Sequence, residues 1–146
     1  ADRLVARLAM EILDARLWVL LPLPYELYVE DFTSAESTEE FQQLVGRSEY
    51  CFELPLKFGT ARELAIDPAN NAARDKQYAL AGAYIAQRSD CLFSVYDGQG
   101  SSGIGGTSQV LNWYSNGQID EEFAYPHEFF EPPEKQPALV YNPFPD

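Results

Sequence analysis

Helical periodicity is the first pattern along the chain. Over residues 2–13, apolar residues recur every three or four positions while Arg3, Arg7 and Glu11 share the opposite face, which predicts an amphipathic helix. The same spacing predicts helices over 37–47, 74–88 and 107–116, with a further helical turn over 25–32.

Residues that favour helix ends support these bounds. Ser37 or Thr38 is expected to cap one helix and Thr107 another, because short hydroxyl side chains accept hydrogen bonds from the first helical amides. Gly117 predicts a left-handed stop at the end of the last helix. Residues 57–73 show no sustained period and are expected to form a long loop.

Short apolar runs alternate with these helices. The run over 16–23 is nearly continuous and ends in prolines, which is typical of a strand buried on both faces. Further strands are predicted over 50–54, 90–96 and 138–142. Cys51 and Cys91 stand in or beside two of these strands, which favours small buried thiols over a disulfide.

The alternation of helices and strands sets the expected fold class. It predicts an α/β protein with a three-layer, Rossmann-like arrangement, in which helices cover both faces of a mostly parallel sheet. The chain has 146 residues, of which 46% are hydrophobic, so it can bury one sizeable core. We therefore expect residues 1–146 to form a single domain.

Charge and hydropathy narrow the classes of function. The chain carries 23 acidic against 10 basic residues, a formal net charge of -13, which disfavours binding to nucleic acid. No apolar run approaches the length of about 18 residues that a membrane span requires, so we expect no membrane partner and no signal peptide. A cytoplasmic location is the expectation that follows.

Glycines cluster between the predicted strand over 90–96 and the helix that follows it. The segment from Gly98 to Gly106 leaves backbone amides unshielded at the positive end of a helix, where a phosphate or carboxylate can bind. The pattern is neither G-x-G-x-x-G nor a P-loop, because no Lys-Ser or Lys-Thr follows the last glycine. A glycine turn that binds no ligand is the alternative interpretation.

Two carboxylates and an aromatic turn are the other candidates. Asp97 ends the strand before the glycines, where it would contact a ribose hydroxyl, transfer a proton or simply form an Asp-Gly turn. Glu53 ends another strand and would pair with Asp97 if the two lie across one site. Pro24 and Tyr25 follow the first strand, where the ring would stack on a base or pack against loops.

The remaining polar residues do not indicate a metal or a triad. His127 is the only histidine, and no Cys or His neighbours it at metal-ligand spacing. We therefore expect no metal site, no Ser-His-Asp triad and no cofactor. The acidic run over 120–122 is expected to be a solvated face.

Several short motifs along most of the chain fit one known pattern. They are Ala1-Asp2-Arg3-Leu4, Leu21-Pro22-Leu23-Pro24, Asp31-Phe32, Ser89-Asp90, Asp97-Gly98 and Gly103-Ile104-Gly105-Gly106-Thr107. These motifs resemble the SLOG and LOG-like Rossmannoid superfamily, which includes phosphoribohydrolases, DprA-like proteins and domains that sense nucleotide-derived ligands. The resemblance implies that Gly105, Gly106 and Thr107 bind the phosphate side of a nucleotide-like ligand.

Three departures from the family pattern bear on function. Gln109 stands where an acidic residue commonly follows the Gly-Gly-Thr, and Val110 stands where LOG hydrolases carry a glutamate, which argues against carboxylate-assisted cleavage. Relatives begin with a strand and a second ligand-contacting loop, whereas this chain starts at Ala1, as an N-terminally truncated fragment would. A sheet without that strand has an open edge that favours association.

Three functional hypotheses remain. The leading one is a binding module that recognises a nucleotide or nucleotide-derived anion through Gly98, Gly103, Gly105, Gly106 and Thr107, with Asp97 on a sugar hydroxyl. The second is a LOG-like hydrolase of nucleotide N-glycosidic bonds, with Asp97 or Glu53 as the acid/base group. The third is a ligand-free structural or oligomerisation domain. The expected partners are a nucleotide-like small molecule and either a second copy of the chain or an attached effector domain.

Overall fold

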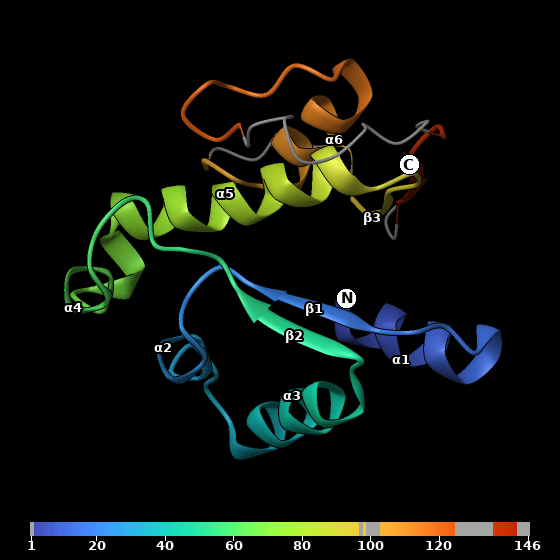
Figure 1. Cartoon of the computed structure of the whole chain (residues 1–146), viewed down its shortest axis with the longest axis horizontal. Helices are drawn as coiled ribbons and strands as arrows, with labels where there is room; N and C mark the ends of the chain where they lie inside the picture. The colour runs from blue at the N-terminus through green and yellow to red at the C-terminus, as the bar shows by residue number, and fades with distance from the viewer. Residues whose placement is uncertain (1, 97, 99–102, 125–135, 143–146) are drawn as a thin grey trace. The chain divides into compact units, whose positions relative to one another are not determined.

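The structure consists of helices and short parallel strands. The computed structural model describes residues 2–96, 98, 103–124 and 136–142. The chain divides into two compact units, Ala1–Ala65 and Ile66–Asp146, and Figure 1 traces the elements of each. The predicted α/β class is therefore confirmed, with small sheets of two strands each among the described residues. The single domain and the three-layer arrangement stay predictions.

The first unit contains one parallel strand pair and four helices among its described residues. Its elements are α1 (Asp2–Leu13), β1 (Trp18–Leu21), α2 (Tyr25–Val29), α3 (Ala35–Arg47), β2 (Tyr50–Glu53) and α4 (Ala61–Leu64). The register of the pair places Trp18 beside Tyr50 and Leu21 beside Glu53. The helix predicted over 2–13 is confirmed in full.

Aromatic rings fill the space between α2 and α3. Phe41 of α3 is buried, and its ring centroid lies 5.7 Å from that of Tyr25, 5.4 Å from that of Tyr28 and 5.1 Å from that of Phe32. Tilted ring pairs at these separations stabilise a core beyond the apolar area that they bury. Burial of Tyr28 raises the pKa of its hydroxyl, although nearby Arg3 opposes the rise.

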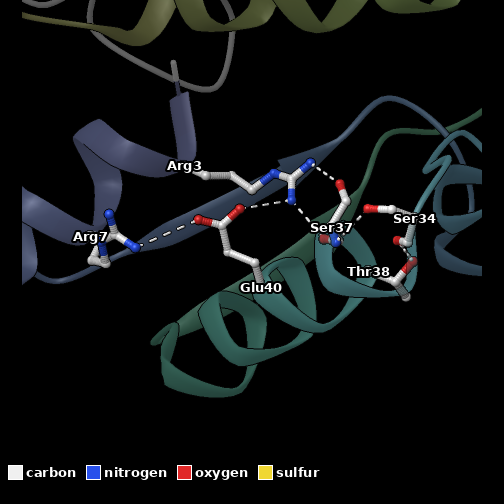
Figure 2. A network of polar contacts seen from close by, with 6 residues as sticks. All are labelled: Arg3, Arg7, Ser34, Ser37, Thr38 and Glu40. Carbon is white, nitrogen blue, oxygen red and sulfur yellow. Dashed lines mark hydrogen bonds and ion pairs between the residues drawn. The ribbon is translucent and has the colours of Figure 1, made fainter.

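A polar network joins α1 to the beginning of α3 (Figure 2). Arg3 Nη1 donates to the carbonyl oxygen of Ser37 at 2.6 Å and to Oε2 of Glu40 at 3.1 Å. Arg7 Nη1 forms an ion pair with Oε1 of the same Glu40 at 3.8 Å. The Ser34 hydroxyl accepts the Ser37 amide and caps α3, which starts at Ala35. The prediction of a cap at Ser37 or Thr38 was wrong, because the first turn carries no large apolar residue that would mark it.

The second unit contains the other parallel pair. Its elements are the 3-10 turn η1 (Pro68–Asn70), α5 (Ala72–Arg88), β3 (Phe93–Val95), α6 (Thr107–Asn116) and β4 (Leu139–Tyr141). The register places Phe93 beside Leu139 and Val95 beside Tyr141. Gly117 has a φ of 67° and ends α6, as predicted.

Small residues let α6 pack closely against α5. A methyl group placed on Gly82 of α5 would lie 2.6 Å from Val110 Cγ2 of α6. Ala79, Ala83 and Ala86 of α5 are buried. Trp113 of α6, three residues after Val110, is also buried, and its ring centroid lies 5.5 Å from that of Phe123. The segment after α6 therefore supplies part of the core around this helix.

Two predictions made from the sequence, a long loop and buried strands, need correction. The loop expected over 57–73 contains α4, which Thr60 and Glu63 hold with a reciprocal capping box, as well as η1 and the start of α5, capped by Asn71. The strands expected to be buried are buried only in part: Leu21 and Ser94 are buried, whereas 59% of Trp18 and 53% of Phe93 is exposed, because each described sheet has two strands only. Cys51 and Cys91 are likewise exposed and free.

Hydropathy adds one finding about the helices. Among those that the structure describes, none combines the length and the apolar character needed to cross a membrane.

Candidate functional site

The glycine-rich connection between β3 and α6 is the first candidate site. Gly98 and residues 103–106 of this connection are described, whereas Asp97 lies outside the described residues. Gly106 has extended backbone angles and occupies the N-cap of α6, so Thr107 is the first helical residue. The prediction that Thr107 caps α6 was therefore wrong, and no side chain accepts a capping hydrogen bond there.

Gly105 is a glycine for two independent reasons. Its φ of 79° lies in the left-handed region, which side chains disfavour. A methyl group at this position would also lie 2.7 Å from Cα and 2.8 Å from the backbone nitrogen of Ala79, in the middle of α5. The loop therefore passes directly against the α5 backbone, and this contact explains Gly105 without a ligand.

The other described glycines of the loop behave differently. Gly98 has a φ of 81°, and a methyl group added to it would meet nothing within 4 Å, so its backbone conformation alone favours glycine. Gly103 has neither a left-handed φ nor a close neighbour, and it is exposed. Packing thus accounts for Gly105, whereas no described residue crowds Gly98 or Gly103.

The amides at the start of α6 define what the loop can bind. The Gly105 amide donates to Oε1 of Gln109 at 2.6 Å, and the Gly106 amide makes a long 3.4 Å bond to the Gly103 carbonyl. No hydrogen bond among the described residues uses the Thr107 amide. Because the positive end of the helix dipole lies here, an oxygen of an anion fits this position.

No ligand-binding or structural role was predicted for Gln109 from the sequence. It is the third residue of α6, and its side chain reaches back to the loop, where its oxygen occupies the kind of position that a ligand oxygen would take. Its Nε2 lies 3.5 Å from an Asp120 oxygen. The signal was a glutamine at the position where a helix commonly carries a residue that caps its own amino-terminal end.

The three candidates of the first unit have local structural partners. Glu53 accepts the Tyr25 amide at 2.7 Å, which satisfies the first amide of α2, and Pro24 is the N-cap of that helix. The Tyr25 ring packs on Phe41. Burial and the Glu53 carboxylate both raise the pKa of the neighbouring Cys51 thiol. The packing interpretation of Tyr25 therefore has direct support.

The described residues offer no obvious metal centre. Nowhere in residues 2–96, 98, 103–124 and 136–142 do three His, Cys, Asp or Glu side chains gather as they would around a metal ion. His127 lies outside these residues.

Comparison with known proteins adds no assignment. The chain matches no protein-family model, and it has no significant match among curated proteins or solved structures.

Proposed function

We propose that this chain is a binding module that holds a nucleotide or nucleotide-derived anion at the amino-terminal end of α6. The observation that carries the proposal is the Thr107 amide, which has no acceptor among the described residues at a helix start without a side-chain cap. The proposal also includes a Rossmann-like, three-layer fold and a cytoplasmic location. Both are inferred from the sequence, and the fold also from its resemblance to SLOG and LOG-like proteins.

Each part of the loop has a distinct role in this proposal. The Thr107 amide donates to one phosphate oxygen. The Gly105 amide donates to a second oxygen after the Gln109 carboxamide turns away, so the bond that Gln109 makes in the free protein is exchanged for a bond to the ligand. Gly98 and Gly103 leave room for the ligand, and Asp97 contacts a sugar hydroxyl.

Charge restricts the size of the ligand. A chain of net charge -13 repels a polyanion along its whole length, whereas a small anion needs only one favourable local field. The helix dipole and the loop amides supply that field over a few ångströms. The proposed ligand is therefore a mononucleotide or a molecule of similar size.

The test is thermal unfolding of the chain with nucleoside mono-, di- and triphosphates, cyclic nucleotides and NAD-type compounds. A ligand at 100 times its dissociation constant stabilises the folded state by about 2.7 kcal/mol. Gln109→Glu should abolish the shift, because a carboxylate at this position repels the phosphate while still suiting the start of a helix. Gln118→Glu makes the same change of charge at an exposed residue beyond α6 and should keep the shift.

The outcomes separate the competing functions. A shift that Gln109→Glu removes and Gln118→Glu keeps supports binding at α6. Free base released from a nucleoside monophosphate in the same samples would make the chain a hydrolase. The absence of a shift with every compound would contradict the proposal and favour a structural domain.

A further inference from the structure

Two helices of the first unit meet through matched pairs of polar side chains. Arg3 and Arg7 are one turn apart on α1, and Ser37 and Glu40 are three positions apart on α3, so each pair lies on one face of its helix. Both arginines reach the Glu40 carboxylate, Arg3 at 3.1 Å and Arg7 at 3.8 Å. Arg3 also donates to the carbonyl and to the hydroxyl of Ser37 (Figure 2). The arginines of α1 therefore converge on one carboxylate of α3.

Arg3 extends this attachment to the aromatic cluster between α2 and α3. Its guanidinium carbon lies 4.7 Å from the centroid of the Phe32 ring, which is within the range of a cation–π contact. The Phe32 ring packs in turn on the rings of Tyr28 and Phe41. The guanidinium of Arg3 therefore covers part of this cluster while it holds the first turn of α1 to α3.

Apolar burial alone does not fix the position of α1. No residue of this helix is buried with the whole chain counted, so the first unit by itself buries none of them either. The apolar side chains that are covered in part are Val5, Ala6, Ala9 and Met10. Most helices of folded proteins are stabilised by a buried apolar face. Because α1 lacks one, its ionic contacts are a large part of what holds it.

The length of α1 couples its attachment to its folding. The helix has 12 residues, and an isolated helix of this length is only marginally stable in water. The side chains of Arg3, Arg7 and Glu40 are all partly exposed, so salt screens the attraction between them. The screening length falls from about 10 Å at 0.1 M salt to about 3 Å at 1 M. Salt therefore weakens the contacts on which the helical state of α1 depends.

We infer that α1 (Asp2–Leu13) is a salt-sensitive strap, which Arg3 and Arg7 hold against α3 through Glu40. At low ionic strength the strap is docked and helical, and Arg3 covers the Phe32 ring. At high ionic strength α1 detaches and loses its helical structure, and the ring loses this cover. The device lets ionic strength control access to the aromatic cluster. All of these contacts lie within the first unit, so the strap is independent of the ligand site at α6.

The test is amide hydrogen exchange of the chain at about 0.02 M and about 1 M sodium chloride, where screening is weak and strong respectively. The α1 amides should exchange about three- to tenfold faster at the higher concentration, as expected for the loss of two partly exposed ion pairs. The amides of α5, in the other unit, should show no comparable change and so control for general effects of salt.

Two adjacent glutamates of α3 provide matched variants. Glu40→Gln removes the charge that both arginines share. At low salt its α1 amides should therefore exchange as fast as those of the unsubstituted chain at high salt, and added salt should have little further effect. Glu39→Gln makes the same change at a neighbouring exposed residue, and it should behave like the unsubstituted chain.

Three results would overturn the inference. The first is exchange in α1 that is independent of salt, whether the amides are protected or unprotected throughout. The second is an equal effect of Glu40→Gln and Glu39→Gln, since only one of these residues contacts the arginines in the docked strap. The third is faster exchange in α3 that matches the change in α1 for Glu40→Gln, because the network would then stabilise α3 instead of holding α1.

Discussion

Replacing Gly105 with alanine should strongly destabilise the second unit. The left-handed φ of 79° costs an alanine about 1–2 kcal/mol. The new methyl group would also lie 2.7 Å from Cα of Ala79, and a helix backbone cannot move aside as a side chain can. Overpacking of this kind adds about 1–3 kcal/mol, so the total loss should be about 2–5 kcal/mol.

Two other glycines separate the conformational cost from the overpacking cost. Gly117 shares the left-handed φ but has nothing within 4 Å, so Gly117→Ala should lose only the conformational term of about 1–2 kcal/mol. Gly103 has neither constraint, so Gly103→Ala should be neutral or stabilise by about 0.4–1 kcal/mol through the unfolded chain.

Urea unfolding followed by tryptophan fluorescence measures these differences. The chain has two tryptophans, Trp18 in the first unit and Trp113 in the second. A Trp18→Phe background leaves Trp113, which is buried on α6, as the only reporter of the second unit. If Gly105→Ala were no more destabilising than Gly117→Ala, the contact between the loop and α5 would be refuted.

Three further predictions concern single contacts. Tyr114→Phe should cost about 1–2 kcal/mol in the same assay, because it removes a buried hydroxyl that lies 2.7 Å from the Asp90 carbonyl oxygen and 2.5 Å from that of Gln136 and donates its one proton between them. Ser34→Ala should destabilise the first unit by about 1 kcal/mol in urea unfolding followed by Trp18, since it removes the cap of α3. Hydrogen bonds from the Thr60 amide and, to a smaller extent, from its hydroxyl hold the pKa of Glu63 below the usual value of a glutamate, so an NMR titration should find this pKa raised only part of the way in Thr60→Val, which keeps the amide. Because the folded-state pKa is lowered, the stabilisation by this contact is present above the unfolded pKa and is lost as pH falls through the folded one.

The sequence predicted the periodic helices well. The helices over 2–13 and 107–116 have regular apolar spacing, and the structure places α1 and α6 at those bounds. The four-residue helix α4 escaped prediction because its evidence is a capping box, from Thr60 and Glu63, rather than a period. Burial of the strands was overestimated, since an apolar run shows that a strand can be buried but does not supply the elements that cover it.

The sequence pattern located the candidate site but did not predict why its glycines are needed. Glycine clustering before α6 identified the loop, but the reason for Gly105 depends on its approach to Ala79, 26 positions earlier in the chain. Local patterns carry no information about such a contact. The same limit applies to Glu53, whose bond to the Tyr25 amide follows from the pairing of β1 with β2. Gly105→Ala would therefore change folding as well as binding, whereas Gln109→Glu keeps an acceptor for the Gly105 amide and adds one negative charge where the ligand is proposed to bind.

The most direct test of the account is an amide NMR titration of the chain with AMP and, separately, with ADP. The proposal predicts saturable shifts of the Gly105 and Thr107 amides as Gln109 gives up its bond to Gly105. In Gln109→Glu these shifts should disappear, and in Gln118→Glu they should remain. Amides at the start of α6 that stay unchanged up to millimolar nucleotide, or that shift equally in Gln109→Glu, would contradict a ligand site at this helix.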